Sequence, residues 1–466
     1  MASRNLHYLE LLEVARRVQA KEISPVEVTQ AQLDRIAAKD GKLKSYATVT
    51  AELALKQAKQ AEGEIAKGRI RGPLHGVPIA VKDLCYTKGI VTAAGTKIHG
   101  KFKPKHDATV VKRFRDAGAI LLGKLQMTEG AYADHHPDIA PPQNPWNGKH
   151  WSGASSSGSG VATAAGFCYA SLGSDTGGSI RFPSAANGVT GLKPTWGRVS
   201  RYGVFDLAPT LDHVGPMCRS AADTGAVLSV IAGADANDPT AVPLPVPNYL
   251  AGLERGIRGL RIGIDKRYYS RGVDALTIAT LEQALAVISG LGADIRKVSF
   301  PEPDQVVNEW VAHCGVETAY AHRDTYPARQ DDYGPALAGL IDLGRQVSGM
   351  QYQEMLLHRH DFSGRVRALF EDVDLLMIPA QPMASPTLDD MATLGEDPEA
   401  VINLLRFTAP FDLTGSPAIT LPAGLTEAGT PLAFQFVGRH FEEDLLVRAG
   451  HAYQRETDWH RQHPRV

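Results

Sequence analysis

Residues 151–183 read WSGASSSGSGVATAAGFCYASLGSDTGGSIRFP, and the interpretation of the whole chain starts from them. The stretch holds two turns rich in glycine and serine, GASSSG at 153–158 and DTGGSIR at 175–181, joined by small residues. Glycine permits backbone conformations that other residues avoid, so such turns can bring backbone N–H groups close to a bound molecule. A third segment lies upstream, where the apolar run GVPIAV at 76–81 ends in Lys82.

The second turn carries a candidate nucleophile, Ser179, directly after two glycines. Successive backbone N–H groups in this turn could converge on one oxygen, as an oxyanion hole requires. These groups belong to Thr176, Gly177, Gly178 and Ser179. Asp175 and Arg181 flank the turn and could pair to brace it. The alternative is a structural glycine turn with a solvated serine.

A serine hydroxyl is a poor nucleophile until a base removes its proton. Lys82 ends an apolar run, and burial favours the neutral form of lysine, which is a competent base. The alternative for Lys82 is a side chain that snorkels to the surface. Ser155 could pass a proton from Ser179 to Lys82 over a gap too long for one hydrogen bond. The alternative for Ser155 is a flexible Gly/Ser loop.

Jointly, and in this order, these segments resemble the amidase signature family. The resemblance rests on GVPIAVKD at 76–83, GASSSG at 153–158 and DTGGSIR at 175–181. It continues through KPTWGRVS at 193–200, TLDHVGP at 210–216, FTAPFDLTGSPA at 407–418 and FQFVGR at 434–439. It covers most of the chain and is weakest at roughly 237–342.

The resemblance implies hydrolysis of a carboxylic amide to an acid and ammonia or an amine by a Ser–cis-Ser–Lys triad. Ser179 would form the acyl-enzyme, Ser155 would relay protons after a cis peptide bond, and Lys82 would be the base. The four N–H groups of the second turn would hold the oxyanion, and Ser156 would be a supporting hydrogen-bond partner. Neither a metal nor a cofactor is implied. The family usually has glycine where this chain has Ala154 and Ser157, and we place the relay at Ser155.

The implied fold is one α/β domain over residues 1–466, with α/β/α layers around a large mixed sheet. A loop-rich insertion or cap around 237–342 stays open. The sequence supports this class because helix and strand patterns alternate. Strands are expected at 77–81, 119–123, 260–264, 294–298, 375–378, 418–421 and 432–437. Helices are expected from a Ser24 cap to about 38, at 51–67, from an Asp107 cap, from a Ser220 cap to 231, at 275–290, at 350–370 and from 442.

Two branches of the family stay open, the stand-alone amidases and the A subunit of glutamyl-tRNA(Gln) amidotransferase. The A subunit typically carries glutamine after the Ser-Ile-Arg run, and Phe182 stands there in this chain, which favours a stand-alone amidase. Tyr132, His135 and Phe182 are candidates for the substrate-binding wall. An uncharged aryl or alkyl amide is favoured over free glutamine, and esters and urea-like substrates stay open.

Bulk composition limits the partners. Lys plus Arg is 49 and Asp plus Glu is 51, a net charge of −2 that argues against nucleic acid or anionic membrane as a partner. The N-terminal stretch lacks the apolar core of a signal peptide, so we expect a cytoplasmic protein, and a homodimer stays open. The four dispersed cysteines indicate reduced thiols. A metal site at His135-His136 or at His358 and His360 is disfavoured because such pairs diverge.

Overall fold

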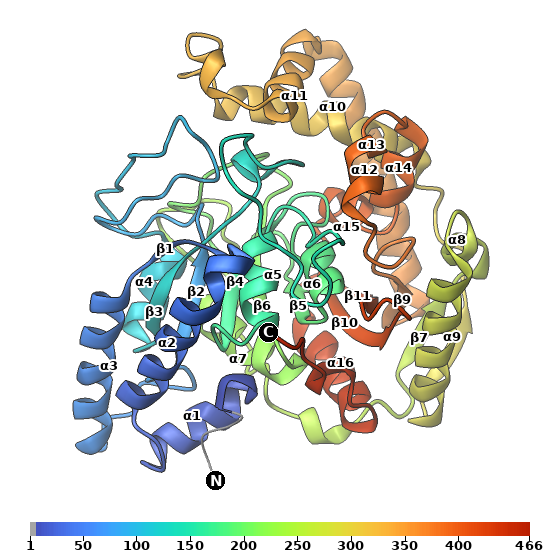
Figure 1. The fold of residues 1–466 in the computed structure, drawn as a ribbon. Helices are drawn as coiled ribbons and strands as arrows, with labels where there is room; N and C mark the ends of the chain where they lie inside the picture. The colour runs from blue at the N-terminus through green and yellow to red at the C-terminus, as the bar shows by residue number, and fades with distance from the viewer. Residues whose placement is uncertain (1–5) are drawn as a thin grey trace.

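The computed structural model describes residues 6–466, whose strands form a single mixed sheet of eleven (Figure 1). The strands are β1 Tyr46–Val49, β2 Pro78–Lys82, β3 Ile120–Leu125, β4 Ala170–Asp175, β5 Thr190–Lys193, β6 His213–Cys218, β7 Arg261–Ile264, β8 Asp294–Lys297, β9 Leu375–Pro379, β10 Ala418–Leu425 and β11 Pro431–Gly438. Their order across the sheet is β1-β3-β2-β4-β6-β5-β10-β11-β9-β7-β8. Strands β3, β2 and β4 run parallel, as do β9, β7 and β8, and the other neighbours are antiparallel. The expected α/β class with a large mixed sheet is confirmed.

The helices are α1 Leu11–Gln19, α2 Pro25–Leu43, α3 Ala51–Ala66, α4 Thr109–Asp116, α5 Ser157–Ala164, α6 Arg181–Asn187, α7 Ala221–Ile231, α8 Lys266–Ser270, α9 Ala275–Gly290, α10 Asp304–Ala321, α11 Pro335–Gln346, α12 Gly349–Asp372, α13 Leu388–Leu394, α14 Pro398–Leu405, α15 Ala409–Leu413 and α16 Glu443–Glu456. Helices α2–α7, α9 and α16 pack on the sheet, whereas α10 packs on α11 and α12. Across the described range 6–466, no helix is long and apolar enough to cross a membrane.

The strand that carries Lys82 is buried on both faces. Successive side chains of a strand point to opposite faces, and in β2 Ala80 belongs to one apolar cluster while Ile79 and Val81 belong to another. The first cluster includes residues of α2, α3 and α5, and the second includes residues of α4 and α7. This two-sided burial explains why β2 is a continuous apolar run rather than an alternating one.

Most elements expected from sequence are present within a few residues of their predicted bounds. Ser24 caps α2 by accepting the N–H groups of Val26 and Glu27, and Ser220 caps α7. The cap predicted at Asp107 is wrong, because α4 begins at Thr109 without a side-chain cap. The Asp107 carboxylate instead accepts the Lys88 N–H and pairs with Arg115.

Segment 237–342, left open as a loop-rich insertion or cap, has the two strands and the helix expected at 260–264, 294–298 and 275–290. It contains β7 and β8, which extend the sheet at one end, and the long helices α9 and α10. Strands β7 and β8 of this segment complete the sheet. Helices α10 and α11 lie together at one end of the molecule, close to α13 and α14 (Figure 1).

Candidate active site

Lys82 is the last residue of β2, and its side chain is fully buried. Its Nζ atom donates hydrogen bonds to Ser155 Oγ at 2.6 Å and to Ser174 Oγ at 2.8 Å. Burial lowers the pKa of Lys82 to about 7, although the negative charge of Asp175 acts in the opposite direction. A substantial share of Lys82 is therefore neutral at neutral pH, and it lies within hydrogen-bond distance of two serine hydroxyls.

The 153–158 turn brings Ser155 to this lysine. Gly153 has φ of 81°, and a Cβ atom there would lie 2.4 Å from the Pro183 backbone, so the turn needs glycine at this position. The peptide bond between Ala154 and Ser155 is cis. Ser155 is fully buried, and α5 begins two residues later at Ser157.

Ser156 connects this turn to the end of β4. Its hydroxyl donates to the Ser174 carbonyl at 3.1 Å and accepts the Ser174 N–H at 3.2 Å. Its own N–H donates to the Ser179 carbonyl at 3.3 Å. Ser156 thus joins the first turn to the end of β4 by two hydrogen bonds and to the second turn by one.

The 175–181 turn is organised around the buried carboxylate of Asp175. This carboxylate accepts the backbone N–H groups of Gly178 at 2.6 Å, Ile180 at 3.0 Å and Arg181 at 3.3 Å. The Arg181 guanidinium adds two further bonds, at 2.9 and 3.0 Å. Burial alone would raise the pKa of Asp175, but Arg181, Lys193 and the backbone N–H donors together outweigh burial and hold that pKa well below its usual range. The ion pair expected from the sequence is therefore present.

Arg181 also ties the turn to the C-terminal part of the chain. It donates to the Asp412 carboxylate at 2.6 Å and to the Thr408 carbonyl at 2.9 Å. Both partners lie in the 407–418 segment, more than 220 residues away in sequence. Arg181 therefore holds the 407–418 segment against the 175–181 turn.

The backbone donors of the turn are not equivalent. The Gly178 N–H already donates to Asp175, so three of the four predicted oxyanion donors are left. Within residues 6–466, the N–H groups of Thr176, Gly177 and Ser179 have no hydrogen-bond acceptor, and neither does the Ser179 hydroxyl. These groups are free to interact with a bound molecule.

A cavity of about 450 Å³ opens over Ser179. Its aromatic walls are Tyr132, Trp151, Phe182 and Trp310, and its aliphatic walls come from α11, α13 and α14. The candidates Tyr132 and Phe182 therefore line it. The candidate His135 does not, because its Nε2 atom lies 3.1 Å from Ser157 Oγ instead. Among the described lining residues the only charged side chain is that of Asp134.

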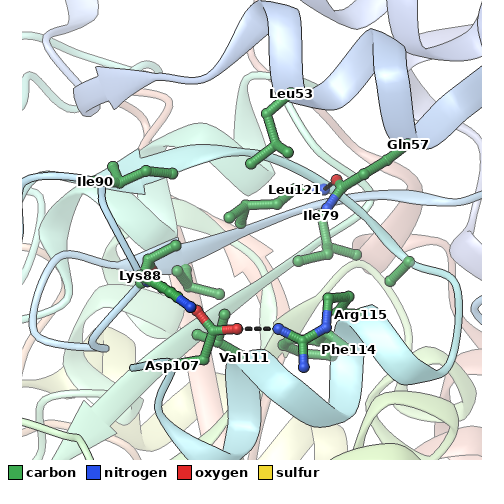
Figure 2. Close-up of a pocket in the computed structure, with 13 residues that line it drawn as sticks. Leu53, Gln57, Ile79, Lys88, Ile90, Asp107, Val111, Phe114, Arg115 and Leu121 are labelled. Carbon is green, nitrogen blue, oxygen red and sulfur yellow. Dashed lines mark hydrogen bonds and ion pairs between the residues drawn. The ribbon is translucent and has the colours of Figure 1, made fainter. Parts of the chain in front are cut away.

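A second cavity, of about 200 Å³, lies between α3, β2, β3 and α4. Figure 2 shows Ile79 and Leu121 in its wall and the Asp107–Arg115 ion pair at its edge. None of the residues predicted to act in catalysis lines it. The candidate active site is therefore the cavity over Ser179.

The histidines weighed as metal ligands have other partners. His136 Nδ1 accepts the Asp138 N–H at 3.1 Å, and His358 Nδ1 lies 2.8 Å from a Glu309 carboxylate oxygen. In the part of the chain that the structure describes, no group of three or more His, Cys, Asp or Glu side chains could hold a metal ion.

Comparison with known proteins gives the family. A family model described as Amidase matches residues 27–447. The chain belongs to the amidase family. This amidase is 51% identical over 458 residues to "Putative amidase AmiD" of Mycobacterium bovis, covering 98% of this chain and 96% of the relative.

Two further proteins that this chain resembles are named for different activities. The amidase is 38% identical over 481 residues to the A subunit of the glutamyl-tRNA(Gln) amidotransferase of Geobacter sp., covering 97% and 98% of the two chains. It superposes on the native peptide amidase from Stenotrophomonas maltophilia with a TM-score of 0.84, 29% identity and 98% coverage of both chains. The protein is thus an amide-hydrolysing enzyme of this family.

Three hydrogen-bond contacts around the site of the amidase were not predicted from the sequence. Ser174 immediately precedes the second turn, so its hydroxyl near Lys82 could have been inferred once the strand ending at Asp175 was recognised. Trp310 donates from Nε1 to the Thr176 carbonyl at 3.0 Å, and Thr408 donates to the Gly177 carbonyl at 2.6 Å. Neither residue carries a local signal, because each acts on a segment far away in the chain.

Proposed function

We propose that this amidase hydrolyses a carboxylic amide through an acyl-enzyme on Ser179, with Ser155 as proton relay and Lys82 as base. The observation that carries the proposal is the buried Lys82 amine, whose Nζ lies 2.6 Å from Ser155 Oγ. Its pKa, lowered to about 7 by burial, matches the requirement that a general base be neutral near physiological pH. Among the described residues that line the cavity over Ser179, Asp134, which is exposed, is the only one with a charged side chain, and Lys82 is buried outside this lining.

The first half-reaction forms an ester between the enzyme and the acyl group. Neutral Lys82 takes the proton of Ser155 while Ser155 takes the proton of Ser179, and Ser179 Oγ attacks the amide carbonyl carbon. The negative oxygen of the tetrahedral intermediate accepts backbone N–H groups from Thr176, Gly177 and Ser179. The C–N bond then breaks, and the proton returns through Ser155 to the leaving nitrogen, which departs as ammonia or an amine.

The second half-reaction repeats these steps with water. Water gives one proton through Ser155 to Lys82 and attacks the acyl carbon, and the collapse of the second tetrahedral intermediate releases a carboxylic acid. The proton passes back to Ser179 Oγ, so the enzyme returns to its starting state. Ser174 shares the Lys82 amine with Ser155 and would hold the lysine in place through both half-reactions.

The cavity supports an uncharged aryl or alkyl amide as substrate. Four aromatic side chains and the aliphatic residues of three helices surround the space over Ser179. Free glutamine carries an α-carboxylate, and within the described lining there is no Lys or Arg to pair with it. An unpaired charge in an apolar site is unfavourable. The lack of a cationic side chain in the described lining therefore favours a stand-alone amidase over a glutaminase subunit.

The test is ammonia and amine release from a panel of aryl, alkyl and amino-acid amides, including glutamine. Ser179→Ala and Lys82→Ala are expected to remove nearly all turnover of the preferred amide, and Ser155→Ala to be somewhat less severe. Turnover of aryl or alkyl amides that survives in Ser179→Ala would overturn the acyl-enzyme. Turnover restricted to glutamine would overturn the proposed substrate class.

A further inference from the structure

Trp310 links the wall of the substrate cavity to the turn that carries Ser179. It lies on α10, is 6% exposed and lines the cavity. Its indole Nε1 donates a hydrogen bond of 3.0 Å to the carbonyl oxygen of Thr176. The ring also packs on Gly177, where a Cβ atom would lie 2.4 Å from Trp310 Cζ2. One side chain therefore contacts both the substrate space and the peptide between Thr176 and Gly177.

The bond to the Thr176 carbonyl also sets the direction of the next N–H group. In a planar trans peptide the C=O and N–H point in opposite directions. The Thr176 carbonyl and the Gly177 N–H belong to the same peptide unit, so a carbonyl held against Trp310 directs the Gly177 N–H away from the indole. That N–H has no acceptor within residues 6–466, and Gly177 lines the cavity.

The following peptide unit is held in a different way. Its carbonyl, from Gly177, accepts the Thr408 hydroxyl at 2.6 Å, and its N–H, from Gly178, donates to Asp175 at 2.6 Å. Both ends of this second unit are thus fixed. In the first unit, among the described hydrogen bonds, only the carbonyl is held, and Trp310 alone holds it.

We propose that Trp310 is a positioning residue that orients the Gly177 N–H toward the oxyanion of the tetrahedral intermediate. The inference rests on the proposed acyl-enzyme function and adds a residue that contacts no reacting atom. Because the same indole forms part of the cavity wall, a substrate that seats against the ring stabilises the donor geometry. Helix α10 thereby contributes to transition-state stabilisation as well as to the shape of the cavity.

The experiment compares Trp310→Phe with Trp151→Phe on a good aryl amide. Phenylalanine at 310 keeps an aromatic wall but removes the N–H donor, so kcat is expected to fall about tenfold with KM within about twofold, as for loss of one hydrogen bond. Trp151 lines the same cavity, but its indole N–H makes no hydrogen bond within residues 6–466. The matched change there is expected to act mainly on KM.

A second readout isolates the oxyanion. A trifluoromethyl ketone that adds to Ser179 mimics the tetrahedral intermediate, whereas the corresponding alcohol only fills the cavity. Trp310→Phe is expected to weaken the ketone about tenfold and the alcohol less than twofold. Equal weakening of the two compounds, or an unchanged kcat, would overturn the positioning role.

Two controls separate failure of this inference from other failures. If Trp310→Phe unfolds, benzothienylalanine at position 310 keeps the bicyclic ring and replaces the N–H by sulfur, and the same tenfold loss is expected. If Ser179→Ala retains turnover, the acyl-enzyme itself fails, whereas a normal Trp310→Phe beside an inactive Ser179→Ala refutes only the positioning role.

Discussion

The proposed role of Lys82 as base makes the activity depend on pH in a way that can be calculated. Burial lowers its pKa to about 7. With that value about half of the enzyme holds neutral Lys82 at pH 7, about a tenth at pH 6 and about a hundredth at pH 5. Since only the neutral form can accept a proton, kcat/KM is expected to fall about tenfold for each pH unit below 7. Above pH 8 it is expected to level off.

The assay is kcat/KM for a neutral aryl amide between pH 5 and 10, with the folded fraction followed by circular dichroism at each pH. Burial also brings the pKa of four other groups to about 7: it lowers that of Lys193 and raises those of Glu129, Asp212 and Asp223. The midpoint of the pH profile of kcat/KM is expected to be unchanged in Lys193→Met and in Glu129→Gln. A profile that is flat to pH 5.5, or a midpoint near 10, would refute Lys82 as the base.

Three further predictions concern stability and binding. Lys82→Met is expected to stabilise the inactive protein by about 2 kcal/mol at pH 7 in urea unfolding. At pH 7 the lowered pKa of Lys82 costs the wild-type protein about 4 kcal/mol of stability, which the substitution recovers. The loss of two hydrogen bonds offsets about half of that gain. Because the unfolded state holds the Lys82 proton up to about pH 10.5, this gain is nearly constant below pH 7, falls to zero at about pH 9 and becomes a loss of about 2 kcal/mol at about pH 10.5; a gain that persists at pH 10.5 would contradict the calculation. Arg181→Leu leaves the buried Asp175 carboxylate without its cation and is expected to cost about 3–5 kcal/mol, whereas a loss below 1 kcal/mol would mean that the pair is dispensable. Glu129→Ala removes the carboxylate that accepts the Gly334 N–H at 2.9 Å, directly before α11, so KM for bulky amides is expected to rise severalfold and kcat to change little; an unchanged KM would show that this contact does not support the cavity wall.

The parts that the sequence predicted well depend on local patterns. Ser24 and Ser220 cap helices because a hydroxyl followed by free N–H groups is a local arrangement, and β2 is apolar because both of its faces are covered. The braced turn between Asp175 and Arg181 was also predictable, since the partners are six residues apart. The roles of Ser155, Ser179 and Lys82 followed from a family resemblance and stay proposals.

The parts that could not be predicted depend on distant contacts or on competition between groups. Trp310 reaches a carbonyl 134 residues away, and nothing in its neighbourhood in the sequence points there. The sequence does not show that the Gly178 N–H already has an acceptor, because only the fold brings the Asp175 carboxylate to 2.6 Å from that nitrogen. The strands at 260–264 and 294–298 were expected, but their place beside β9 at the end of the sheet depends on pairing between segments far apart in the chain.

The environment that weakens Lys82 as a base strengthens it as an acid. Its Nζ atom has two hydroxyl partners, and within residues 6–466 no carboxylate forms an ion pair with it, so the ammonium form is poorly solvated. Free amines hold their protons with pKa values of about 8 to 10. In the proposed mechanism the leaving amine therefore binds the shared proton about ten to a thousand times more strongly than Lys82 does. The transfer of the proton from Lys82 to the departing nitrogen is therefore favourable. Because Lys82 is neutral at both ends of the half-reaction, the buried lysine speeds this step without changing the overall equilibrium.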